Sequence, residues 1–161
     1  MNQIDQVLTS LRRVIRAIDI HSRQLVKSAN ITGPQLRLLQ LIRKHQSATI
    51  KELADAMSLS QATVTSIMDR LENRHLILRV RSQTDKRKIH PQLTADGNAL
   101  LDNAPTLLQD DFVRKFKQLH DWEQHMIIAS IQRVAEMMDA DGIDASPFLD
   151  IGSLDRTETP E

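Results

Sequence analysis

Hydrophobic residues recur at three- and four-residue steps over most of this chain, which is the spacing of amphipathic helices. The pattern predicts helices over residues 4–27, 35–45, 50–57 and 61–74, from residue 95 into the 110s, and over residues 121–138. Thr49, with Glu52 three residues later, matches a capping box, and Ser60 is expected to cap the fourth helix. Pro105 is expected to start a new helical turn or to kink the fifth helix. Gly142 is expected to end the last helix.

The hydrophobic period changes from 3.6 to 2 after the fourth helix. Residues 77–81 and 88–93 are predicted to be strands, joined by a loop at 82–87 that is rich in turn-forming residues. The fourth helix also carries a polar face, made of Gln61, Thr63, Thr65, Ser66, Asp69, Arg70 and Asn73. A short helix, a tight turn at 58–60, a helix with a polar face and a basic hairpin predict a winged helix-turn-helix. The fold class is therefore mainly α with a small β-hairpin wing.

Such a fold can bind double-stranded DNA, because its second helix fits the major groove and its wing can follow phosphates or enter the minor groove. The formal net charge is zero, with 21 basic and 21 acidic residues, but the charges are segregated along the chain. Residues 74–90 hold six Lys or Arg and one acidic residue. Residues 139–161 hold one basic residue and seven acidic residues. The basic cluster in the predicted wing favours phosphate contact.

Composition excludes several other classes of protein. The chain has no Cys, which rules out disulfides, cysteine-bound metals and thiol-based sensing within it. No apolar run approaches the length of a membrane span and no signal pattern is visible, so a cytoplasmic protein without a membrane partner is expected. Nucleophile motifs, phosphate-binding glycine loops and metalloprotease motifs do not occur, so we expect no enzyme activity, no catalytic residue and no cofactor. His120, Glu123 and His125 are interpreted as a polar surface cluster, and no metal site is expected.

An ordered set of motifs runs through the middle of the chain. In chain order it comprises Thr32-Gly33-Pro34-Gln35, Leu53-Ala54, Leu59 to Thr65, Asp69-Arg70-Leu71-Glu72, Arg79, Asp85-Lys86-Arg87, and Leu93-Thr94 with Gly97. At this spacing the chain resembles the MarR family of transcriptional regulators. The resemblance implies a homodimer whose N- and C-terminal helices interlock beneath two DNA-binding lobes. It divides the chain into an N-terminal dimerisation helix, a winged helix-turn-helix domain, C-terminal dimerisation helices and an acidic tail, at 1–30, 31–96, 97–145 and 146–161.

The same resemblance extends to individual residues of the wing. Arg87 is similar to the wing-tip arginine with which the family enters the minor groove. Asp85, an acidic residue in a basic loop, is expected to accept hydrogen bonds that fix the loop and orient Arg87 or Arg79. Arg70 is expected either to grip phosphate or to brace the wing. The full set of expected DNA contacts is Ser60, Gln61, Thr63, Thr65, Ser66, Arg70, Arg79, Lys86, Arg87 and Lys88.

His75 departs from the family pattern, which usually has glycine just after the recognition helix. Glycine serves at this position because a helix C-terminus often needs a positive φ. Histidine tolerates that conformation better than β-branched residues do, so the turn is expected to survive with some strain.

Residues 11–23 and 145–152 look like the EctR or CosR branch of the family, which regulates the synthesis and uptake of compatible solutes. That likeness implies a repressor of osmotic-stress genes, controlled by an ionic or small-molecule effector. One alternative is a regulator released by a small molecule in an unrelated pathway. The other is a winged helix that binds protein, which the polar helix face disfavours because protein-binding surfaces carry apolar or aromatic anchors.

Overall fold

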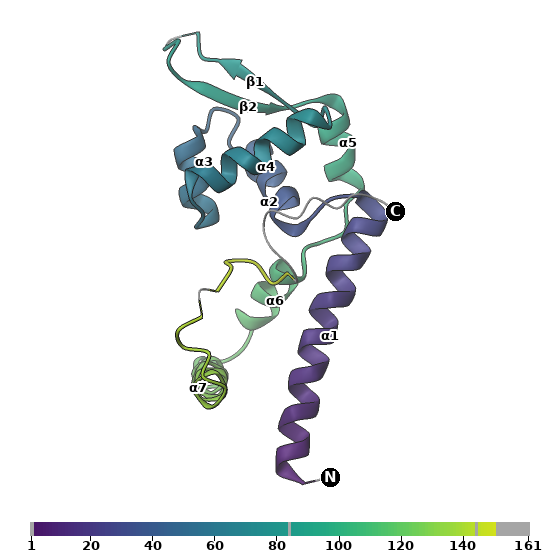
Figure 1. Cartoon of the computed structure of the whole chain (residues 1–161), viewed down its shortest axis with the longest axis vertical. Helices are drawn as coiled ribbons and strands as arrows, with labels where there is room; N and C mark the ends of the chain where they lie inside the picture. The colour runs from purple at the N-terminus through teal and green to yellow at the C-terminus, as the bar shows by residue number, and fades with distance from the viewer. Residues whose placement is uncertain (1, 84, 144, 151–161) are drawn as a thin grey trace. The chain divides into compact units, whose positions relative to one another are not determined.

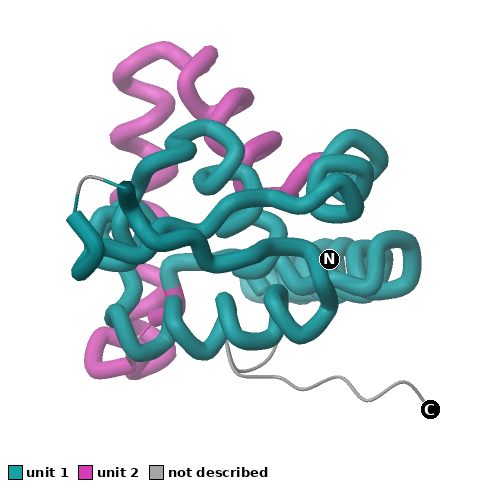
Figure 2. Tube along the Cα trace, turned by 90° about the horizontal axis from the view of Figure 1, so that it is seen from above, with its two compact units in different colours: residues 1–105, 147–161 teal, residues 106–146 magenta. Residues whose placement is uncertain are grey.

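The computed structural model describes residues 2–83, 85–143 and 145–150, in a chain that divides into two compact units. Residues 1–105 and 147–161 form the first unit and residues 106–146 form the second (Figure 2). The first unit contains α1 (Gln3–Ala29), α2 (Gly33–Lys44), α3 (Ile50–Met57), α4 (Gln61–Asn73), β1 (Ile77–Arg81), β2 (Ile89–Leu93) and α5 (Ala95–Asn103). The second contains α6 (Leu108–Phe116) and α7 (Asp121–Met137). No helix in the described part of the chain is long and apolar enough to cross a membrane.

The core of the first unit lies among α2, α3 and α4. Its fully buried side chains include Leu36, Leu38, Leu39 and Ile42 of α2, Leu53 of α3, and Val64, Ile67, Met68 and Leu71 of α4. β1 and β2 form an antiparallel hairpin in which Ile77 pairs with Leu93 and Arg81 pairs with Ile89. In Figure 1 this hairpin, the wing, lies beside α3 and α4. The structure thus confirms the predicted mainly helical fold with a two-stranded wing.

Side chains near the helix starts explain why α3 and α4 begin where they do. The Thr49 hydroxyl accepts a hydrogen bond from the Glu52 N–H, and the Glu52 carboxylate accepts one from the Thr49 N–H at 2.7 Å. The Thr49 N–H and the Thr49 hydroxyl both donate to the Glu52 carboxylate and hold the pKa of Glu52 below its ordinary value, because they favour the charged form. Ser60 caps α4 by accepting a hydrogen bond from the Thr63 N–H. Both predicted caps are therefore confirmed.

The end of α4 is formed by His75 in the left-handed conformation, with a φ of 57°. The His75 N–H donates to the Glu72 carbonyl, and the Leu76 N–H donates to the Leu71 carbonyl. This pair of bonds is a Schellman motif, which satisfies carbonyls left open at a helix end. The turn therefore keeps, with histidine, the geometry for which glycine is better suited.

Thr94 and Gly97 lock the far end of the wing to the start of α5. The Thr94 hydroxyl donates to the His75 carbonyl at 2.7 Å and accepts a hydrogen bond from the Gly97 N–H at 3.0 Å. A Cβ atom added at Gly97 would overlap the backbone oxygen of Leu76. Only glycine therefore allows α5 to approach the α4–β1 turn this closely.

Two of the predicted helix boundaries are wrong. The helix expected from residue 95 into the 110s is two helices, because Ala104 is extended, with a ψ of 144°, as a residue before proline prefers. The last helix ends at Met137, one residue before the predicted end at 138, but Gly142 is not the residue that ends it. Asp139, with a φ of 52°, supplies the left-handed residue expected of that glycine, and the Ala140 N–H bonds to the Ala135 carbonyl.

The apolar stripes predicted on residues 4–27 and 121–138 lie on the surface of the chain. Val14 and Ile15 on α1 are 58% and 59% exposed, and Trp122 and Ile131 on α7 are 64% and 58% exposed. No residue of α7 is buried, and Leu25 is the buried residue of α1. The sequence pattern left open whether these stripes form a monomer core or an interface. In this chain each of the two stripes is exposed.

Candidate nucleic-acid interface

The turn between α3 and α4 places the two helices so that one face of α4 points outward. Ser58 adopts the left-handed conformation, with a φ of 54°, and the Leu59 N–H donates to the Ala54 carbonyl. The apolar stripe of α4 packs into the core, where Val64 and Leu71 are fully buried. The polar residues of α4 therefore lie on the side opposite the core.

Hydrogen bonds within α4 determine what its hydroxyl groups can offer a ligand. The Ser60 and Thr63 side-chain oxygens lie 2.8 Å apart and share one hydrogen bond. The Thr65 hydroxyl donates to the Gln61 carbonyl at 2.8 Å, so its oxygen is left as an acceptor beside its methyl group. The Gln61 side chain is exposed in the first turn, whereas Ser66 and Arg70 are half-buried.

The wing loop is held by backbone hydrogen bonds that centre on Asp85. Its carboxylate accepts a hydrogen bond from the Arg87 N–H at 3.1 Å, and its own N–H donates to the Ser82 side chain at 3.3 Å. The Lys88 N–H donates to the Asp85 carbonyl, and the Ser82 N–H donates to the Lys88 carbonyl, both at 2.9 Å. Asp85 therefore fixes the backbone of Arg87.

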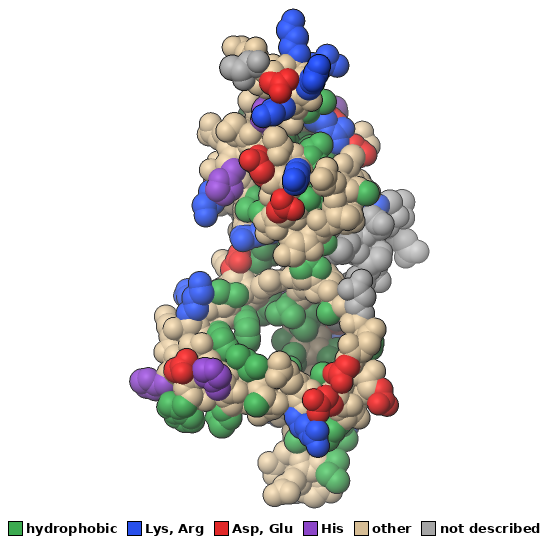
Figure 3. All heavy atoms as spheres, turned by 90° about the vertical axis from the view of Figure 1, so that its left-hand side faces the viewer, with side chains coloured by type: hydrophobic (Ala, Val, Ile, Leu, Met, Phe, Trp, Pro, Cys, Tyr) green, Lys and Arg blue, Asp and Glu red, His purple; other side chains and the backbone are tan. Residues whose placement is uncertain are grey.

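The basic side chains of the loop project from this fixed backbone. Lys86, Arg87 and Lys88 are all exposed. In Figure 3, Lys and Arg side chains gather at the end of the molecule that carries the wing. The lobe therefore combines an outward polar helix face with a cationic hairpin loop, which is a shape and a charge that suit a nucleic-acid duplex.

Arg79 is placed differently from the other expected DNA contacts. Its guanidinium forms ion pairs with Asp69 and Glu72 of α4, at 2.5 Å and 3.0 Å, and its side chain is 25% exposed. Sequence reasoning raised a bracing role for Arg70 and missed that these two carboxylates bind Arg79. The signal was available in principle, because Asp69 and Glu72 stand three residues apart on one helix face.

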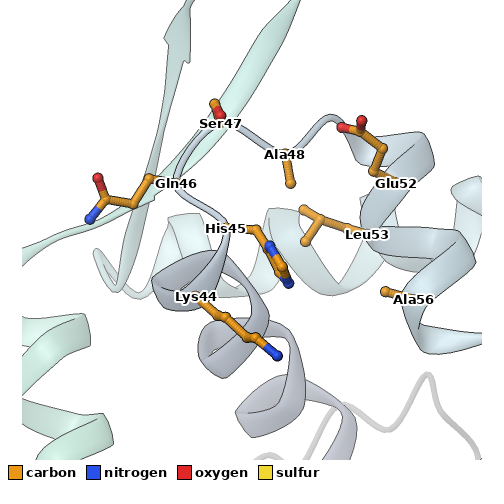
Figure 4. Close-up of a pocket in the computed structure, with 8 residues that line it drawn as sticks. All are labelled: Lys44, His45, Gln46, Ser47, Ala48, Glu52, Leu53 and Ala56. Atoms are coloured by element: carbon orange, nitrogen blue, oxygen red, sulfur yellow. The ribbon is translucent and has the colours of Figure 1, made fainter.

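The wing also contacts the loop between α2 and α3. The His90 ring nitrogen Nδ1 lies 3.3 Å from the Ala48 carbonyl oxygen. Beside this loop is an open recess of about 530 Å³, in which the side chains of His45 and Leu53 point toward one another (Figure 4). Lys44 and Glu52 bring opposite charges to its lining.

The His120 cluster is organised as a helix start. The Glu123 carboxylate accepts a hydrogen bond from the His120 N–H at 2.8 Å, and His125 Nδ1 lies 2.7 Å from the Asp121 carbonyl oxygen. Within residues 2–83, 85–143 and 145–150, no group of three or more His, Asp or Glu side chains could hold a metal ion.

Comparison with known proteins relates this arrangement to a known family. The MarR family profile matches residues 31–89, which run from the start of α2 through the wing loop. Over this segment the chain is similar to the MarR family. The relatives reported below are named as transcriptional regulators, which agrees with the regulator that the motifs predict.

The curated relatives point the same way. It is 35% identical, over 82 residues, to the organic hydroperoxide resistance transcriptional regulator of Bacillus subtilis (strain 168). That match covers 51% of this chain and 56% of the relative, so it spans little more than half of the relative's length. The compatible-solute branch, by contrast, finds no support in these comparisons.

Solved structures confirm the MarR-like fold. The chain is similar to S. aureus MepR in its complex with DNA, with a TM-score of 0.58 and 21% identity over 81% of this chain and 96% of MepR. It is also similar to the PcaV regulator of Streptomyces coelicolor in complex with its natural ligand. For PcaV the TM-score is 0.55 and the identity 23%, over 80% of this chain and 90% of PcaV. At these identities the likeness concerns the fold.

Proposed function

We propose that this protein is a homodimeric repressor of the MarR family that binds a pseudo-palindromic DNA operator and is released by a small-molecule effector. The observation that carries the proposal is the pairing of an outward polar face on α4 with a wing loop that exposes Lys86, Arg87 and Lys88. The two features supply the two parts of duplex recognition, which are base-edge contacts in the major groove and cationic contacts beside it.

The first turns of α4 carry the proposed base contacts. Gln61 offers an exposed amide that can donate to and accept from adenine. Thr65 offers an acceptor oxygen and a methyl group, which suit an amino group and a thymine methyl respectively. Ser60, Thr63, Ser66 and Arg70 complete the proposed face, as base or phosphate contacts.

The wing loop carries the proposed contacts to phosphates and the minor groove. Arg87 is exposed on a backbone that the Asp85 carboxylate fixes, so its side chain starts from a defined position. A cation held in this way suits the narrow minor groove, where the negative potential is enhanced. Lys86 and Lys88 flank it and suit the adjoining phosphates.

Dimerisation is the proposed role of the exposed apolar surfaces on α1 and α7. Large apolar side chains such as Ile15 on α1, and Trp122 and Ile131 on α7, are more than half exposed, and monomeric proteins rarely expose large apolar patches to water. A two-fold dimer would present two copies of α4 to two half-sites about one helical turn apart, roughly 10 bp. Trp122 is the sole tryptophan, so its fluorescence can report burial on association.

A small-molecule effector is favoured over the osmotic assignment. PcaV, whose fold the chain shares, was solved with its natural ligand, whereas the names of the relatives reported above do not concern compatible solutes. Repression of osmotic-stress genes therefore stays a prediction. It is tested by measuring operator affinity against salt at fixed osmolality, with and without ectoine or glycine betaine. Affinity that is flat across moderate salt would exclude release by ions, because displaced counterions make phosphate contacts salt-dependent.

The experiment that tests the proposed function is selection of bound fragments from genomic DNA of the source organism. We expect recovery of a shared pseudo-palindromic sequence. The Gln61→Ala and Arg87→Ala variants should lose enrichment of that sequence. Lys115→Ala, an exposed basic position on α6, is the charge-matched control and should retain it. Recovery of no preferred sequence by the unmodified protein would overturn the proposal.

A further inference from the structure

We infer that Arg79 is a positioning residue that fixes the wing to α4, rather than one of the groups that contact DNA. This inference deepens the proposed function and rests on it. Arg79 lies at the centre of β1, opposite Pro91 of β2. Its two terminal nitrogens reach two different carboxylates of the recognition helix, those of Asp69 and Glu72.

The geometry leaves the Arg79 guanidinium little freedom. Nη2 lies 2.5 Å from Asp69 Oδ1, and Nη1 lies 3.0 Å from Glu72 Oε2. A planar guanidinium that meets acceptors through both terminal nitrogens has its orientation fixed as well as its position. Its Nε atom is buried without a hydrogen-bond partner, so the inner part of the group also lies within the protein. Turning the group toward a phosphate would break both ion pairs.

Arg79 adds a side-chain link between β1 and α4 to the packing of the two elements against one another. A two-stranded hairpin is marginally stable by itself. The chain passes from α4 to β1 through Arg74, His75 and Leu76. Arg79 ties the strand to α4 beyond this connection, and His90 ties the other strand to the α2–α3 loop. The brace therefore sets the distance between the loop that carries Arg87 and the helix face that carries Gln61.

Neutralising the carboxylates beside Arg79 should change the DNA affinity in opposite directions, depending on which role Arg79 has. Asp69 and Glu72 are partly exposed, with 54% and 38% of their side chains accessible, so they repel nearby phosphates. If Arg79 served as a phosphate contact, neutralising both carboxylates would free a cation, remove repulsion and tighten DNA binding. If Arg79 is a brace, the same change releases the wing and weakens binding to the operator.

The decisive variant is therefore Asp69→Asn combined with Glu72→Gln, with Asp55→Asn as a control for the loss of an exposed acidic charge on α3. Affinities for the selected operator and for random DNA are measured by fluorescence anisotropy at equal salt. We expect the operator affinity of the double variant to fall about tenfold. A change of this size is within the range of interaction energies between residues of one salt-bridge network. Its affinity for random DNA should stay equal or rise. Tighter or unchanged operator binding would overturn the inference.

Substitution of Arg79 itself supplies a second test that does not depend on the double variant being folded. Arg79→Lys can meet one carboxylate at a time and should lie between the parent and Arg79→Met in operator affinity. The slope of log affinity against log salt should stay the same in both variants. Loss of a phosphate contact from each protomer of a dimer would instead flatten that slope by about 2. Such flattening would overturn the inference.

A distance measurement separates failure of the brace from failure of the proposed function. The chain has no cysteine, so cysteines introduced at Asn73 and Gln83 are unique attachment sites for spin labels. With labelled protein diluted into unlabelled protein, the α4-to-wing distance distribution should broaden when Asp69 and Glu72 are neutralised. An unchanged distribution would refute the brace whether or not the protein binds an operator. A parent protein without sequence preference would refute the proposed function alone.

Discussion

Replacing His75 with glycine should stabilise the protein. His75 has a φ of 57°, a region in which a side chain with a Cβ atom costs about 1–2 kcal/mol. Glycine avoids this cost but loses about 0.5–1 kcal/mol more backbone entropy on folding. The difference predicts a gain of about 0.5–1 kcal/mol. The His75 side chain is exposed, so its removal forfeits little burial.

The gain is measured by urea and thermal unfolding at one protein concentration, because the stability of the proposed dimer would depend on concentration. A domain of this size should show a rise in Tm of roughly 2–3 °C. His75→Ala is the matched control, since it removes the imidazole but keeps the Cβ atom and should give no gain. Equal stability of the glycine and alanine variants would refute the argument from backbone conformation.

Three further predictions address the α5 junction, the wing and the cap of α3. Gly97→Ala should lower the unfolding free energy by about 1–3 kcal/mol, because the new Cβ meets the Leu76 backbone; an unchanged Tm would contradict this. Arg87→Ala should weaken operator binding by about 1–3 kcal/mol without a change in Tm, and parent-like binding of this variant across a salt series would refute the wing assignment. Asp85→Ala should also weaken operator binding, because it releases the loop backbone. The folded-state pKa of Glu52 is lowered, so its contribution to stability is present above the ordinary value of 4.5 and is lost as pH falls through the folded value. The stability difference between the parent and Glu52→Gln should therefore shrink as pH falls below 4.5, and a constant difference would exclude this link.

The sequence was most informative where local chemistry decides the structure. Thr49, Ser60 and the polar face of α4 predicted the helix starts and the helix-turn-helix, since capping side chains act within a few residues of themselves. His75 could be placed in a left-handed turn because the family that the chain resembles usually has glycine at this position, where a helix end often needs a positive φ. These features need no knowledge of distant contacts.

The sequence was least informative where distant residues or competing local signals decide the outcome. Arg79 was interpreted as a DNA contact because its charge is visible in the sequence, whereas its pairing with Asp69 and Glu72 depends on how β1 lies against α4. Asp139 ended α7 before Gly142, because an aspartate can also adopt the left-handed conformation. The stripes on α1 and α7 have the same period whether they face a core or a partner, so periodicity could not separate the two.

The most direct test of the central claim is the stoichiometry and footprint of the complex with the selected operator. Native mass spectrometry counts the protomers on one duplex, and hydroxyl-radical footprinting locates the contacts. The account predicts two protomers per duplex, with two protected half-sites centred about 10 bp apart and related by a two-fold axis. One protomer on a single half-site, or protection without a preferred position, would contradict it.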